Sequence, residues 1–133
     1  ILILIRESGY EMEMEHIENN CFLPQECMET TNNEDFFKSL TKHSSHFDNL
    51  LAKAKSKDSR LKFVASFDNG KASVGLQFIP IESPFYNLEG KDNIVEFYTD
   101  RYIDQPLIIK GAGAGAAVTA SGIFADVIRI GNV

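Results

Sequence analysis

This sequence has fewer basic than acidic residues. It has 13 lysines and arginines against 19 aspartates and glutamates, a formal net charge of −6 over 133 residues. Nucleic-acid binding depends on clustered basic side chains that displace counterions from phosphates, and no such basic stripe is present. The charge therefore argues against nucleic acid and anionic membrane as partners. It still allows local phosphate binding by backbone amides, because those donors need no net positive charge.

Cysteines and long apolar runs are also scarce. Cys21 and Cys27 are the only cysteines. They do not make a disulfide framework, and reduced thiols of a cytoplasmic protein are the default expectation. No stretch approaches the ~18 apolar residues of a membrane span. The chain lacks an initiator methionine and opens with ILILIRESG, inside an apolar pattern that is too short for a signal-peptide core. We therefore expect the first helix to begin upstream of Ile1.

Catalytic and metal-binding sets are missing as well. No Ser/His/Asp or Cys/His arrangement has a suggestive context, so we assign no catalytic residue to the chain. The best metal candidates are His16, Cys21 and Cys27, but C-x5-C is not a recognised zinc spacing, and we expect no metal. His43 and His46 are expected to be structural or surface residues.

Strict alternation marks the segment YEMEMEHI at 10–17. The pattern predicts a half-exposed strand with Glu11, Glu13 and Glu15 on one face. Such a carboxylate row can bind a hard cation, but a solvated face or a blunted sheet edge is the more common outcome.

Two helices, a hairpin and further strands follow. Asn32 is a candidate N-cap for the first helix and Ser45 for the second. Asn69-Gly70 lies between two alternating runs and predicts a tight hairpin. NIVEFYTD and PLIIK are expected to be strands, and a last helix begins near Ala116. The elements predict one α+β domain with a mainly antiparallel sheet of about five strands and helices on one face.

A glycine-rich segment, GAGAGAAVTASG at 111–122, joins the last strand to the last helix. Gly111, Gly113 and Gly115 permit positive φ and let a backbone approach a ligand closely, and the following helix directs its N-terminal amides into the same space. One interpretation is a backbone patch that contacts a dinucleotide phosphate, and the other is a tight packing turn. The last helix is apolar over a wide arc, so we expect it to be covered on more than one side.

Three segments together resemble one family. They are LILIRESGYEMEMEHI at 2–17, SPFYNLEGKDNIVEFYTDRY at 83–102 and QPLIIKGAGAGAAVTASGIFADVIRI at 105–130. The pattern resembles the C-terminal part of homoserine dehydrogenase, and its aromatic-rich middle segment is most similar to the bifunctional aspartokinase–homoserine dehydrogenases. The resemblance is weakest between Glu18 and Ser59. Ala112 is a mild departure, since the family commonly has proline there.

The resemblance implies an NADP- or NAD-dependent enzyme that reduces L-aspartate 4-semialdehyde to L-homoserine, on the route to threonine and methionine. Residues 1–110 would belong to its catalytic and dimerisation region, with a homodimer formed through the sheet. Residues 111–133 would return to complete an upstream Rossmann domain. The family position that meets the cofactor matches Gly115, with Gly113 and Ala114 as supporting candidates. The family's catalytic lysine would lie upstream of Ile1, so the isolated chain is expected to be inactive.

Two other interpretations remain open from the residues alone. The chain could be a small α+β regulatory or amino-acid-binding module, in which the glycine segment is only a packing turn. It could also be a purely structural dimerisation piece.

Overall fold

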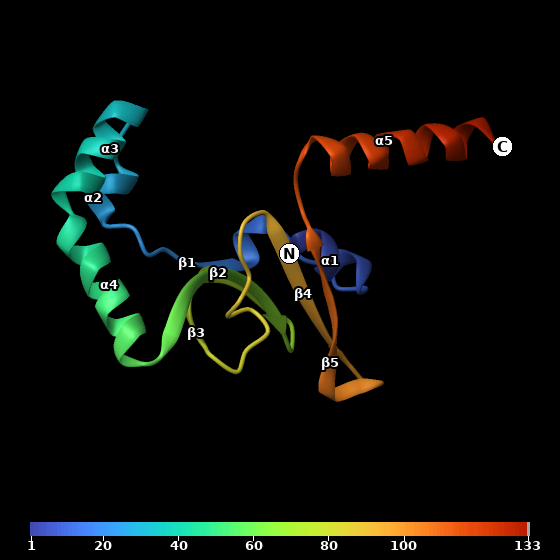
Figure 1. The fold of residues 1–133 in the computed structure, drawn as a ribbon, viewed down its shortest axis with the longest axis horizontal. Coiled ribbons are helices and arrows are strands. Elements are labelled where there is room, and N and C mark those ends of the chain that lie inside the picture. The colour runs from blue at the N-terminus through green and yellow to red at the C-terminus, as the bar shows by residue number, and fades with distance from the viewer. Residues whose placement is uncertain (133) are drawn as a thin grey trace. The chain divides into compact units, whose positions relative to one another are not determined.

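The computed structural model describes residues 1–132 and divides into two compact units, Ile1–Tyr86 and the chain from Asn87 onward. Both combine helices with mostly antiparallel strands (Figure 1), which confirms the α+β class. The strands form two sheets, a three-stranded sheet in the first unit and a two-stranded sheet in the second, where the sequence predicted one.

The first sheet has the order β1-β3-β2. Its strands are β1 (Ile17–Asn20), β2 (Ser59–Asp68) and β3 (Lys71–Pro80). The predicted hairpin is confirmed: β2 and β3 pair antiparallel up to Asp68 and Lys71. Asn69 and Gly70 between them have φ of 48° and 78°, the left-handed pair that a two-residue hairpin turn requires. β1 pairs with β3 in parallel, from Ile17 opposite Ala72.

The core of this unit lies against one end of the sheet. α1 (Leu2–Glu7) buries Ile5, and Gly9 follows with the positive φ of a helix stop. Ile5, Met12 and Ala72 form the buried cluster. Partly buried apolar side chains pack around it: Leu2, Ile17 and Phe67.

The predicted strand at 10–17 is wrong, and with it the expected row of Glu11, Glu13 and Glu15. A 3-10 turn occupies Met14–His16, and strand pairing starts only at Ile17. Two contacts override the alternating pattern. Arg6 donates from Nε to the Met12 carbonyl at 3.0 Å, and Glu13 and His16 close a reciprocal capping box. The chain therefore turns where the period of the sequence predicts extension.

Three helices separate β1 from β2. They are α2 (Gln25–Met28), α3 (Asn33–Lys42) and α4 (Ser44–Ser56). Asn32 is confirmed as the N-cap of α3, because its Oδ1 accepts from the Asp35 amide at 2.9 Å. The Ser45 cap is wrong: α4 begins at Ser44, with His43 as an N-cap that makes no side-chain cap bond. Figure 1 shows α3 and α4 following one another as an arm that leads into β2.

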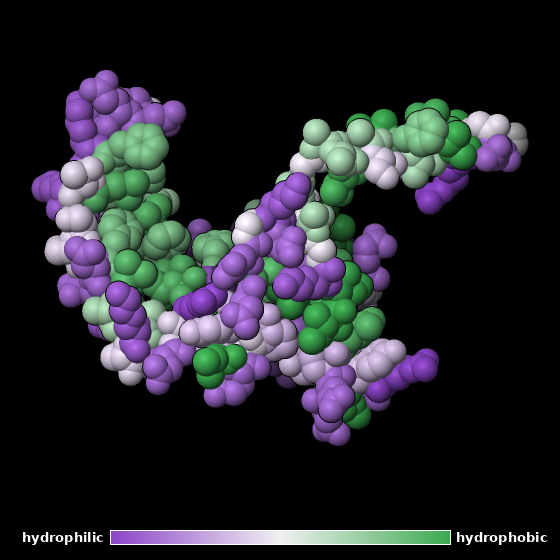
Figure 2. Space-filling model, in the orientation of Figure 1, coloured by the Kyte–Doolittle hydropathy of each residue, from purple (hydrophilic) through white to green (hydrophobic). Residues whose placement is uncertain are grey.

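The second unit is a hairpin followed by a helix. β4 (Asp92–Thr99) and β5 (Tyr102–Ala112) pair antiparallel, and α5 (Ala116–Gly131) follows the glycine segment. Every residue of α5 is exposed, and its apolar surface is visible in Figure 2. β5 runs past residue 110, so the boundary at 110/111 falls inside a strand; it remains a prediction about how the chain is shared between domains. Within residues 1–132, no helix is long and apolar enough to cross a bilayer.

Candidate functional site

The glycine loop Gly113–Gly115 lies between the end of β5 and the start of α5. The amide of Gly113 donates to the Lys91 carbonyl at 3.0 Å. A β-carbon on Gly113 would overlap the side-chain amide of Asn93. Two contacts from residues just before and at the start of β4 therefore fix the course of the loop at Gly113.

Gly115 has an unusual backbone. Its φ of 128° and ψ of 153° lie in a region almost closed to residues that carry a side chain. Gly115 is the N-cap of α5, and its carbonyl accepts the first intrahelical bond, from the Thr119 amide at 3.0 Å. A β-carbon added to Gly115 would lie 3.0 Å from Nζ of Lys91. The lysine ammonium group therefore lies beside the start of the helix.

The electrostatics of this end of α5 suit an anion. No side chain caps the first turn, and no acidic residue lies in it. The amides of the first turn point out of the helix, where the macrodipole is positive. The charge of Lys91 adds to the same field. Backbone donors at a helix N-terminus favour a phosphate group, and a nearby cation strengthens the attraction.

The three predicted cofactor-binding residues, Gly113, Ala114 and Gly115, make up this loop, and their contact with a cofactor stays a prediction. Ala114 is exposed between the two glycines, and Gly115 is half-buried. Sequence reasoning missed the two residues that border them, Lys91 and Asn93. Their segment reads only as a turn-rich stretch, and the register that pairs Asn93 with Gly111 is needed to bring it to the loop.

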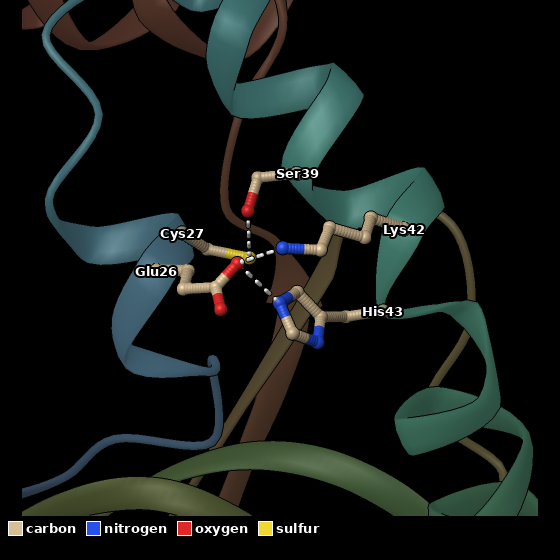
Figure 3. Close-up of polar contacts among 5 residues, drawn as sticks. All are labelled: Glu26, Cys27, Ser39, Lys42 and His43. Atoms are coloured by element: carbon tan, nitrogen blue, oxygen red, sulfur yellow. Dashed lines mark hydrogen bonds and ion pairs between the residues drawn. The ribbon is translucent and has the colours of Figure 1, made fainter.

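A second polar cluster joins α2 to α3 (Figure 3). Glu26 Oε2 accepts from Lys42 Nζ at 2.6 Å and contacts His43 Nε2 at 3.2 Å. Hydrogen bonds from Lys42 and then His43 hold the pKa of the Glu26 carboxyl below its ordinary value of 4.5. Beside it, buried Cys27 Sγ lies 3.3 Å from Ser39 Oγ. These contacts tie the short α2 onto the helical arm, and they are structural.

Of the residues weighed as metal ligands, His16 accepts a hydrogen bond at Nδ1 from the Glu13 amide. His46, which was expected to be structural or at the surface, has its Nε2 2.9 Å from the Phe22 carbonyl. Cys21 is exposed and Cys27 is buried. Across residues 1–132 there is no group of three or more His, Cys, Asp or Glu side chains that could hold a metal ion.

Comparison with known proteins gives one consistent result. The family model described as homoserine dehydrogenase matches residues 1–128. The chain is 35% identical over 129 residues to the bifunctional aspartokinase/homoserine dehydrogenase of Haemophilus influenzae, covering 97% of this chain and 16% of that protein. It is 35% identical over 133 residues to the homoserine dehydrogenase of Schizosaccharomyces pombe, covering 98% and 35%.

A solved structure agrees with the fold. A crystal structure of a Candida auris protein of unknown function superposes with a TM-score of 0.85 at 35% identity, covering 98% of this chain and 37% of the other. The chain thus spans about a sixth of the bifunctional relative and about a third of the fission-yeast relative. A match of this extent does not favour a separate regulatory module. The family-model match over residues 1–128 shows that the chain belongs to the homoserine dehydrogenase family, and these relatives agree with it.

Proposed function

We propose that this chain is the C-terminal part of a homoserine dehydrogenase that uses NADPH or NADH to reduce L-aspartate 4-semialdehyde to L-homoserine. The observation that carries the proposal is Gly115, whose extended positive-φ backbone starts α5 beside the Lys91 ammonium group. The family match supports the reaction, and the short share of each relative that the chain spans supports a part of a larger enzyme.

The loop fits an anionic dinucleotide. Gly115 would contact the cofactor through its backbone, with Gly113 and Ala114 beside it, because a side chain at Gly115 would project toward Lys91 and narrow the space. When bound, the nicotinamide cofactor supplies the hydride that the aldehyde carbon receives. The contribution of this chain is to hold and orient, through amides that need no reorganisation on binding.

No residue of this chain is assigned to proton transfer in the proposal. A lysine outside these 133 residues would perform it. The exposed apolar faces of α5 would be covered by the nucleotide-binding domain, because an apolar helix with no buried residue is otherwise unsupported in water.

The proposal includes a homodimer formed through sheet surface. Leu107 and Ile109 expose apolar side chains on one face of β5, and Ile108 exposes one on the other face. Exposed apolar surface on a sheet is a candidate interface. We place the enzyme in the cytoplasm, where thiols such as Cys21 and Cys27 stay reduced, and expect neither nucleic acid nor membrane as a partner.

The test is homoserine-dependent reduction of NADP⁺ and NAD⁺ by the full-length protein that contains this chain, with the 133-residue chain run beside it. We expect activity from the former only. Gly115→Leu in the longer protein should raise the KM for the cofactor far more than the KM for homoserine. A longer protein with no such activity, or a Gly115→Leu variant with unchanged cofactor KM, would overturn the proposal.

A further inference from the structure

We propose that Asn93 is a positioning residue for the glycine loop: its side-chain amide packs over Gly113 and so sets the direction in which Gly115 presents its backbone. This inference rests on the proposed function, because it concerns the same loop. It adds a residue of β4, 20 positions upstream of Gly113, to a site assigned so far to 113–115 only.

The geometry fixes one point of the loop from two sides. The Lys91 carbonyl accepts from the Gly113 amide at 3.0 Å, which holds the main chain. The Asn93 side chain lies where a β-carbon of residue 113 would project, with Oδ1 at 3.1 Å from that point and Nδ2 and Cγ closer still. Only glycine can occupy position 113 while Asn93 keeps this rotamer.

The effect of Asn93 is one of shape. Asn93 is exposed, its side chain lies against Gly113, and β4 holds its backbone opposite Gly111. A leucine at this position would have nearly the same shape and would retain the contact, whereas alanine would remove it. Comparison of Asn93→Leu with Asn93→Ala therefore separates packing by the side chain from any hydrogen bond that it makes.

The consequence reaches Gly115 because only one residue separates it from Gly113. Freed from Asn93, Gly113 and Ala114 gain backbone conformations, and the extended positive-φ state of Gly115 becomes one of several. Ligand affinity falls in proportion to the population of the competent conformer. The loss should appear in cofactor binding and much less in the KM for homoserine.

The experiment measures the dissociation constant of NADPH by fluorescence, together with thermal unfolding, in the full-length protein. The variants are Asn93→Ala, Asn93→Leu, Gly113→Ala and the double Asn93→Ala/Gly113→Ala, with Asn49→Ala on α4 as the matched control. We expect Asn93→Ala to weaken NADPH binding about fivefold and Gly113→Ala more than about tenfold, while Asn93→Leu and Asn49→Ala stay within about twofold of wild type.

The double variant is decisive, because Asn93→Ala opens the space that an alanine at 113 needs. It should bind NADPH more tightly than Gly113→Ala alone. The inference is overturned if the NADPH dissociation constant of the double variant equals the product of the two single effects. It is also overturned if Gly113→Ala leaves NADPH affinity unchanged, or if Asn93→Leu loses as much NADPH affinity as Asn93→Ala. Positions 93 and 113 could be coupled in unfolding temperature but not in NADPH affinity, while Gly115→Leu still weakens cofactor binding. That result would make the contact purely structural, and it would overturn this inference but leave the proposed function standing. A silent Gly115→Leu would instead remove the proposed function.

Discussion

The amino group of Lys91 lies 3.0 Å from the point that a β-carbon on Gly115 would occupy, so the lysine and a side chain at 115 compete for one space. Gly115→Ala therefore meets both a contact and a backbone conformation that alanine rarely adopts. We expect a loss of about 1–3 kcal/mol in the free energy of unfolding, measured by denaturant unfolding of the full-length protein. The double variant Lys91→Ala/Gly115→Ala should retain most of that loss, because the strain is in the backbone. A fully stable single variant would contradict the assigned conformation.

Substitution of Gly122 tests whether another domain covers α5 in the full-length protein. It has open space around its Cα in this chain, so Gly122→Ala should raise the helix content of the 133-residue chain, by about 1 kcal/mol of helix propensity. If a nucleotide-binding domain covers this side of α5 in the full-length protein, Gly122→Ala should lower the thermal stability of that protein, because the added methyl group meets the covering domain. Circular dichroism of the two proteins makes the comparison. Stabilisation in both would contradict coverage at Gly122.

Gly75 on β3 is required by the parallel pairing with β1. A β-carbon there would lie 2.7 Å from Cβ and 2.9 Å from the carbonyl oxygen of Asn20, so an added methyl group must push the strands apart. We expect Gly75→Ala to cost about 1–3 kcal/mol of unfolding free energy. Gly111→Ala is the control, because Gly111 lies in β5 with nothing within 4 Å of its added β-carbon. Equal effects of the two variants would exclude a close approach of β1.

Acid should weaken the attachment of α2 through Glu26. The pKa of Glu26 is lowered in the folded protein, so its stabilising contribution is present above the ordinary pKa of 4.5 and is lost as pH falls through the lowered value. Below pH 4.5 the unfolding temperature of the wild type should therefore fall more steeply than that of Glu26→Gln. Glu82→Gln is the control, because Glu82 is exposed and outside the cluster. Parallel pH curves for wild type and Glu26→Gln would contradict the prediction.

Self-association should depend on the exposed surface of β5. We expect Ile109→Lys to shift the full-length protein from dimer to monomer in light scattering at micromolar concentration, because a charge replaces apolar surface that is exposed in the single chain. Ile81→Lys is the matched control, since Ile81 is exposed but lies in a turn after β3. A dimer that persists in Ile109→Lys would place the interface elsewhere.

Local signals in the sequence were sufficient where a structure forms within a few residues. The cap by Asn32 and the turn at Asn69-Gly70 depend on side chains and dihedral angles of neighbouring residues, and both were predicted. The helix stop at Gly9 belongs to the same class. The α+β class followed from the sum of such elements.

The wrong strand prediction shows one limit, which is that the periodicity of a sequence does not report which polar contacts the folded chain makes. The alternation at 10–17 predicts a strand, but Arg6 binds the Met12 carbonyl and turns the chain. Lys91 and Asn93 were missed for a different reason, because they reach Gly113 only through the antiparallel register of β4 and β5. Periodicity reports which side of an element is apolar, and it carries no information on which partner will lie there.

The parallel pairing of β1 with β3 has a consequence for how this family can vary. Ile17 lies opposite Ala72, so the pairing closes a loop of about 55 positions that contains α2, α3, α4 and then β2. The entropy of closing a loop rises only slowly with its length, by about 0.6 kcal/mol for each doubling. Insertions or deletions in this loop therefore cost little closure entropy while the strands at its ends stay fixed.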